Sequence, residues 1–193
     1  VAASSATSTR LAQNAYAGMT ADRVRFVGAI GADPGVIVVA KDSPFTSLTE
    51  LIGAIKANPG SVTFAGGSAT GGFDHMKPLM LLRRAGFTDI RKVKYISLDG
   101  GADAITQTIG GFTQAMTGDM SEVVGFLKAG EIRVLAVLTD ERVPGFEDIP
   151  TAKEQGFDVV AVNWRGVYVP KGISDDQFNT WAERLKAVAE SEQ

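Results

Sequence analysis

The chain has 193 residues, of which 45% are hydrophobic and 21% charged, with a formal net charge of -3. These values are ordinary for a globular protein, and the length predicts one domain or two small lobes. The absence of cysteine excludes thiol nucleophiles, disulfide scaffolds and Cys-ligated metals, and the single histidine, His75, excludes a multi-histidine metal site. We therefore expect no metal and no cofactor. The acidic balance argues against nucleic-acid binding, and no apolar run approaches the roughly 20 residues of a membrane span.

The strands are predicted from short apolar runs rich in β-branched residues. The first 20 residues, rich in Ala, Ser and Thr, predict instead a helix followed by a turn. Beyond them, the apolar runs indicate buried strands. These predicted strands cover residues 24–30, 36–40, 61–65, 92–96, 112–116, 132–138 and 159–169.

The helices between these strands have recognisable ends. Ser47 and Glu50 have the spacing of a capping box, which predicts a helix that runs to about Ala57. The next helix is expected to begin near residues 74–77, because Pro78 is tolerated only in the first turn. Further helices are predicted at residues 102–109, at residues 121–129 and after a second capping box at residues 174–177. This alternation predicts an α/β fold with a parallel sheet and crossover helices.

A glycine-rich loop lies between a predicted strand and a predicted helix at residues 66–72, Gly-Gly-Ser-Ala-Thr-Gly-Gly. Glycines leave backbone amides uncovered, a helix N-terminus carries partial positive charge, and Ser68 and Thr70 add hydroxyl donors, so the loop suits an anion. The phosphate motifs do not fit: the P-loop lysine and the G-x-G-x-x-G spacing are both missing. Without a lysine in the loop, a carboxylate is the better match. The alternative is a tight turn that holds no ligand.

Two further strand-to-helix junctions contain glycine and polar residues. One includes Gly100 and Gly101, and the other includes Gly118 and Asp119. In an α/β sheet all three junctions are expected at the carboxyl ends of strands, where ligands bind. The alternative is that the glycines serve turns and that Asp119 caps a helix.

A catalytic site is not supported by these residues. The loop superficially resembles the G-x-S-x-G elbow of hydrolases, but Thr70 stands where the last glycine is required. His75 lies only seven residues from Ser68 on the same segment, so it does not supply the distant general base of a catalytic triad. We expect a binding protein rather than an enzyme.

The loop and four other stretches resemble a known family. The sequence Gly-Gly-Ser-Ala-Thr-Gly-Gly-Phe-Asp-His at residues 66–75 resembles a loop of the tripartite tricarboxylate transporter receptors, the TctC/Bug solute-binding proteins. Residues 38–44, 127–137, 148–156 and 163–170 agree as well. Their order and spacing match along residues 23–185.

The resemblance implies a fold, a function and a binding site. The fold would be a two-lobed α/β periplasmic binding protein of type II, a "Venus flytrap", with residues 1–64 and 163–193 in one lobe and residues 65–162 in the other. The protein would be a periplasmic monomer that captures citrate or another organic acid and delivers it to a membrane permease. The ligand-binding residues carried over are Ser68, Ala69, Thr70, Gly71, Gly72, Gly100, Gly101 and Asp119.

The chain also departs from the family pattern. It lacks the N-terminal strand and the first-lobe binding loop and stops short of the usual C-terminal helix, so we interpret it as a fragment of a longer receptor. Thr70 replaces a common glycine. The main alternative is the effector-binding domain of a transcription regulator, which shares the two-lobed fold and would have a DNA-binding helix pair upstream.

Overall fold

The computed structural model describes residues 1–191, which form two compact units. The small unit contains residues 1–33 and the segment from Asn163 onward, and the large unit contains Pro34–Val162. The expected lobe division placed residues 34–64 in the first lobe. Instead, Ile37 and Leu51 from this segment are fully buried in the core of the large unit.

Among the described residues, the small unit contains three strands, two α-helices and a short 3-10 helix, Ala21–Arg23. The elements are β1 (Ala2–Ser4), α1 (Ser5–Ala12), the first part of β2 (Val24–Ala40), β7 (Val162–Pro170, which begins one residue inside the large unit) and α6 (Asp175–Ala189). β1 pairs with β7 in antiparallel fashion. β1 was not predicted, because three residues are too few to show an alternating pattern. The capping box of Ser174 and Gln177 at the start of α6 is confirmed.

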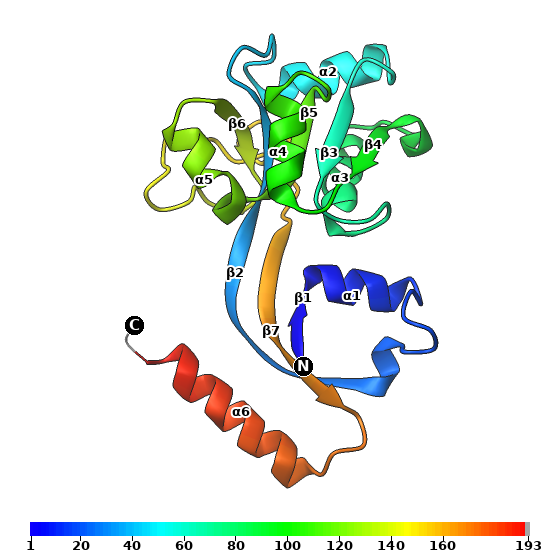
Figure 1. The fold of residues 1–193 in the computed structure, drawn as a ribbon, viewed down its shortest axis with the longest axis vertical. Coiled ribbons are helices and arrows are strands. Elements are labelled where there is room, and N and C mark those ends of the chain that lie inside the picture. The colour runs from blue at the N-terminus through cyan, green and yellow to red at the C-terminus, as the bar shows by residue number, and fades with distance from the viewer. Residues whose placement is uncertain (192–193) are drawn as a thin grey trace. The chain divides into compact units, whose positions relative to one another are not determined.

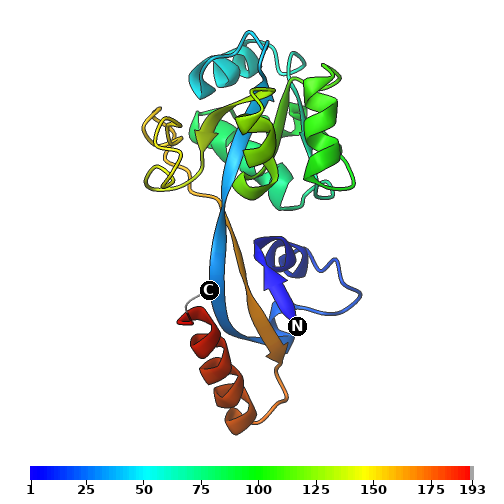
Figure 2. The same cartoon turned by 60° about the vertical axis from the view of Figure 1, so that its left-hand side comes forward.

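The large unit is an open sheet with helices on both faces (Figures 1 and 2). Its strands lie in the order β6-β2-β5-β3-β4. After β2 the elements are α2 (Leu48–Ala57), β3 (Thr63–Gly66), α3 (Phe73–Arg84), β4 (Lys94–Ser97), α4 (Gly101–Ile109), β5 (Ala115–Asp119), α5 (Met120–Lys128) and β6 (Ile132–Val137). Among the described residues, each helix is too short or too polar to cross a lipid bilayer.

Alternating side chains of the strands build a core on each face of this sheet. Along β2, Ile37 and Val39 pack with α2 and α3, whereas Val36 and Val38 pack with α4 and α5. All four are fully buried. A strand that is covered on both faces has a continuous run of apolar residues, and this run is why the sequence predicts a strand at residues 36–40.

The sheet is mixed rather than wholly parallel. β3 pairs in parallel with β4 and with β5, as predicted, but β2 runs antiparallel to β5 and to β6. The succession β2-α2-β3 has the same pattern of apolar runs as a parallel crossover, although β2 and β3 run in opposite directions and are separated by β5. The prediction of a parallel sheet was therefore wrong for one strand.

The strands predicted at residues 24–30 and 36–40 are one continuous strand, β2 (Figure 2). The sequence Asp33-Pro34-Gly35 between them is typical of a turn, but the fixed φ of proline is also compatible with extended backbone. Gly35 joins this segment to the chain at Ala161, because the Gly35 amide donates to the Ala161 carbonyl oxygen over 3.0 Å. The segment therefore remains extended.

Candidate functional site

Three strand-to-helix loops meet at one edge of the large unit. Because β3, β4 and β5 are parallel, the loops that lead from them into α3, α4 and α5 lie on the same side of the sheet (Figure 1). We call residues 66–74, 97–101 and 117–122 the loop edge. The first two loops touch: a Cβ atom added to Gly67 would lie 2.7 Å from the Gly100 carbonyl carbon. The Leu98 amide also donates to the Gly66 carbonyl oxygen over 3.0 Å.

Ser68 is held from both sides in this arrangement. Its carbonyl oxygen accepts hydrogen bonds from the Tyr95 hydroxyl at 2.7 Å and from Ser97 Oγ at 2.9 Å. Its own Oγ accepts the Asp74 amide at 3.0 Å, which caps the first turn of α3. Burial raises the pKa of Tyr95 to about 12, so this hydroxyl remains a donor at neutral pH. These hydrogen bonds hold the loop conformation at Ser68.

Gly71 and Gly72 are required by the backbone itself. Gly71 has φ of +81°, and its amide donates to His75 Nδ1 over 2.9 Å. The His75 ring stacks on Tyr95, with ring centroids 4.5 Å apart. Burial lowers the pKa of His75, which favours the neutral ring that accepts this bond. A Cβ atom at Gly72 would lie 2.7 Å from the Ala69 carbonyl oxygen.

The exposed side of the loop presents donors. Among residues 1–191, no protein acceptor takes the backbone amides of Ser68, Ala69 and Thr70, and the last two residues are exposed. α4 begins beside them after Gly100, which has φ of +115° and no side chain that could cap the helix. Amides next to a helix N-terminus suit a carboxylate or another anion.

Asp119 lies at the loop edge but turns its side chain inward. The residue is only 4% exposed, and its Oδ1 lies 2.6 Å from Lys77 Nζ. It also caps α5 in a capping box with Glu122, whose Oε2 accepts the Asp119 amide at 3.0 Å. A helix cap, the alternative role considered from the sequence, accounts for the contacts with Glu122 but not for the contact with Lys77.

Lys77 is the functional candidate that the sequence reasoning missed. It is fully buried in α3, directly beneath the loops. Its Nζ lies 3.0 Å from Asp74 Oδ1 and 2.6 Å from the Gly118 carbonyl oxygen, in addition to its contact with Asp119. The helical spacing of Lys77 and Leu81 places both on the buried face of α3, and this was the available signal.

Pro78 explains how the sheet is joined to α3. α3 begins at Phe73, one residue before the predicted range of 74–77. Pro78 therefore lies in the second turn of the helix, whereas the prediction placed it in the first turn. A proline there leaves the carbonyl oxygen four residues earlier without its helical partner. That oxygen belongs to Asp74, and it accepts a hydrogen bond from Thr117 Oγ1 at 3.1 Å. The end of β5 therefore replaces the missing donor.

Glu122 adds negative charge to the same cluster. Atoms of its carboxylate lie 2.5 to 2.8 Å from the position of a Cβ atom on Gly101, so a side chain at Gly101 would displace this carboxylate. Partial burial of this carboxylate raises the pKa of Glu122, and the charges of Asp119 and Asp74 raise it further. The cluster thus contains one cation, Lys77, and three carboxyl groups.

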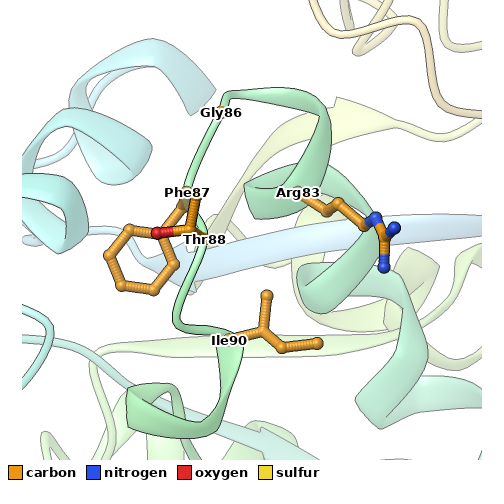
Figure 3. Close-up of a pocket in the computed structure, with 5 residues that line it drawn as sticks. All are labelled: Arg83, Gly86, Phe87, Thr88 and Ile90. Atoms are coloured by element: carbon orange, nitrogen blue, oxygen red, sulfur yellow. The ribbon is translucent and has the colours of Figure 1, made fainter.

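Several hollows border α3, and two of them differ in their distance from the loop edge. One of about 290 Å³ is formed by Arg83, Gly86, Phe87, Thr88 and Ile90 at the end of α3 and the turn that follows (Figure 3). It is a helix length, roughly 18 Å at 1.5 Å per residue, from the loop edge. The other, of about 360 Å³, borders the loop edge and includes Thr70, His75 and Tyr95.

Comparison with known proteins gives one consistent result. Residues 4–189 match the family model "Tripartite tricarboxylate transporter family receptor". BugT of Bordetella pertussis is 32% identical over 147 residues, which is 76% of this chain and 44% of BugT. A TctC solute-binding protein from Polaromonas, solved without ligand, is 26% identical with a TM-score of 0.77, and MatC from Rhodopseudomonas palustris with bound malate is 18% identical with a TM-score of 0.81. Each of these alignments covers 100% of this chain and 64% of the solved chain. The chain therefore spans about half of BugT and less than two thirds of the two solved proteins.

Proposed function

Because this chain belongs to the tripartite tricarboxylate transporter receptor family, as the resemblance predicted, we propose that it is part of a periplasmic solute-binding receptor. It captures an organic acid as a monomer and delivers it to the membrane subunits of a transporter. The two compact units correspond to the two lobes of the receptor, and the loop edge supplies the anion contacts of the large unit.

One observation carries this proposal: the amides of Ser68, Ala69 and Thr70 donate to no acceptor among residues 1–191, and they lie beside the uncapped start of α4. A hydrogen bond to a charged group contributes about 1.5–3 kcal/mol, and a helix N-terminus adds about 0.3–1 kcal/mol. Three or four such contacts match the roughly 8 kcal/mol of micromolar binding.

The solved relatives support a carboxylate as the ligand class. MatC, which has a similar fold, was solved with malate, a dicarboxylate. The Polaromonas relative is described as a solute-binding protein. This description favours capture over the two alternatives drawn from the sequence, a regulator's effector domain and an enzyme.

Calorimetry with malate and with citrate tests the proposal on this chain. We expect Ser68→Ala to weaken binding about tenfold, because the Ser68 hydroxyl caps α3 and holds the loop. The matched control is Ser61→Ala, since Ser61 is exposed at the opposite end of β3 and its hydroxyl donates to the Ala54 and Asn58 carbonyl oxygens, away from the loop edge. The proposal fails if the unmodified chain binds no carboxylate, and the loop is removed from the site if Ser68→Ala binds as the control does.

A further inference from the structure

The buried ammonium of Lys77 connects all three loops of the loop edge. Lys77 is completely buried, and its three N–H groups are matched by three acceptors: Asp74 Oδ1, the Gly118 carbonyl oxygen and Asp119 Oδ1. The Phe73 ring lies 5.0 Å from Nζ. With its donors used in this way, Lys77 acts on a ligand only through the residues it holds.

Each acceptor leads to a different part of the site. Asp74 donates its amide to Ser68 Oγ in the first loop, and its carbonyl oxygen accepts from Thr117 at the end of β5. Asp119 belongs to the capping box with Glu122, whose carboxylate fills the space under Gly101 at the start of α4. A path of hydrogen bonds and packing therefore runs from Lys77 to every loop.

Stability alone does not explain a buried lysine at this position. Removing a cation from water is costly, and an apolar side chain of similar volume is often as stabilising as a buried ion pair. The cation has a second effect here, because it offsets Asp74 and Asp119, which lie under a loop suited to an anion. Without it, Asp74 and Asp119 would lose the cation that contacts both of them.

On the premise of the proposed function, we propose that Lys77 is a positioning residue of the anion site. It clamps α3 to the β5–α5 junction so that the amides of the first loop stay open, and it offsets part of the negative charge of the carboxylates beneath them. A negatively charged ligand is then held by the loop amides above a cluster whose negative charge Lys77 reduces.

The test compares three variants of the full chain. Lys77→Met removes the clamp and the cation. Glu122→Gln removes one negative charge but keeps an oxygen that accepts the Asp119 amide. Lys128→Met lowers the net charge as Lys77→Met does, at an exposed position in α5, and is the control. Affinity for malate and for citrate is measured by calorimetry, and loop protection without ligand by amide hydrogen exchange over residues 67–74 and 98–102.

We expect Lys77→Met to bind at least tenfold more weakly and to speed loop exchange at least tenfold, with β6 unchanged. Glu122→Gln should bind two- to threefold more tightly, and Lys128→Met should stay within twofold of the unmodified chain. A plain packing role would weaken binding in both Lys77→Met and Glu122→Gln, and that outcome overturns the charge argument. Unchanged affinity and exchange in Lys77→Met overturn the whole inference.

Two further results, a chain that binds neither acid and a Lys77→Met variant that does not fold, are interpreted differently. If the unmodified chain binds neither acid, the proposed function fails, while loop exchange in Lys77→Met still decides the positioning role. If Lys77→Met does not fold, Thr117→Val tests the same clamp, because it removes only the hydroxyl that bonds to the Asp74 carbonyl oxygen. Faster exchange at residues 72–76 in this variant supports the clamp, and unchanged exchange contradicts it.

Discussion

Two neighbouring helices of the large unit begin in opposite ways. α5 starts at Asp119, whose carboxylate is buried against Lys77, and Glu122 closes the capping box. α4 starts after Gly100, which has no side chain and a positive φ of 115°. The N-terminus of α5 therefore has acceptors within the protein, whereas no side chain among residues 1–191 caps the N-terminus of α4.

The difference teaches that a polar strand-to-helix junction is not by itself a ligand contact. The junctions at Gly100 and at Asp119 looked equivalent in the sequence, since each follows a strand and precedes a helix. What separates them is the partner of the acid, Lys77, which comes from α3 more than 40 residues away. The following substitutions test this contrast.

The largest effect is expected for Asp119→Ala. It removes the cap of α5 and leaves the buried Lys77 ammonium with less compensation, which should lower the free energy of unfolding by about 3–5 kcal/mol. The control is Asp103→Ala in the first turn of α4, an exposed residue for which we expect less than about 1 kcal/mol. Urea denaturation of both variants measures the contrast. If Asp119→Ala keeps its stability but loses malate affinity, Asp119 is a ligand contact, as the sequence analysis first suggested.

A smaller effect is expected where two loops touch. In Gly67→Ala the new methyl group would lie 2.7 to 2.8 Å from the backbone of Gly100 and Gly101, so the loops must separate. Overpacking of this kind costs about 1–3 kcal/mol, and we expect malate binding to weaken at least tenfold. Gly53→Ala in α2 is the control, because open space surrounds it and alanine favours a helix by about 0.5–1 kcal/mol. Equal stability changes in the two variants, measured by thermal unfolding, would mean that the loops are not in contact.

Local features of the fold could be predicted from the sequence, as could the parallel pairing of β3 with β4 and β5, whereas other long-range features could not. The caps at Ser47 and Ser174 were found because their partners lie three residues away. The antiparallel direction of β2 was not, because it depends on which distant strands lie beside it. Lys77 was missed for the same reason: its acceptors Gly118 and Asp119 are joined to it only by the folded sheet.

The smallest effect concerns Glu122 and depends on pH. Its folded pKa is raised above the ordinary value of 4.5, first by burial and then by the charges of Asp119 and Asp74, so the folded state prefers the protonated form. The contribution of Glu122 to stability is thus fully present below pH 4.5 and is lost as pH rises through the folded pKa. Glu122→Gln removes this pH-dependent loss of stability. Because the residue is partly exposed, we expect the substitution to raise the free energy of unfolding by no more than about 1 kcal/mol at pH 7 and not at all at pH 4.

Chemical denaturation at both pH values checks this prediction against Glu141→Gln, a control at an exposed position outside the loop edge. The control changes the net charge equally but lies away from Asp74 and Asp119, so its stability difference should not vary with pH in the same way. A gain for Glu122→Gln that is the same at pH 4 and pH 7 would show that the charge of Glu122 is not opposed by its neighbours. The start of α5 would then be closed by hydrogen bonds alone, and the electrostatic contrast with α4 would disappear.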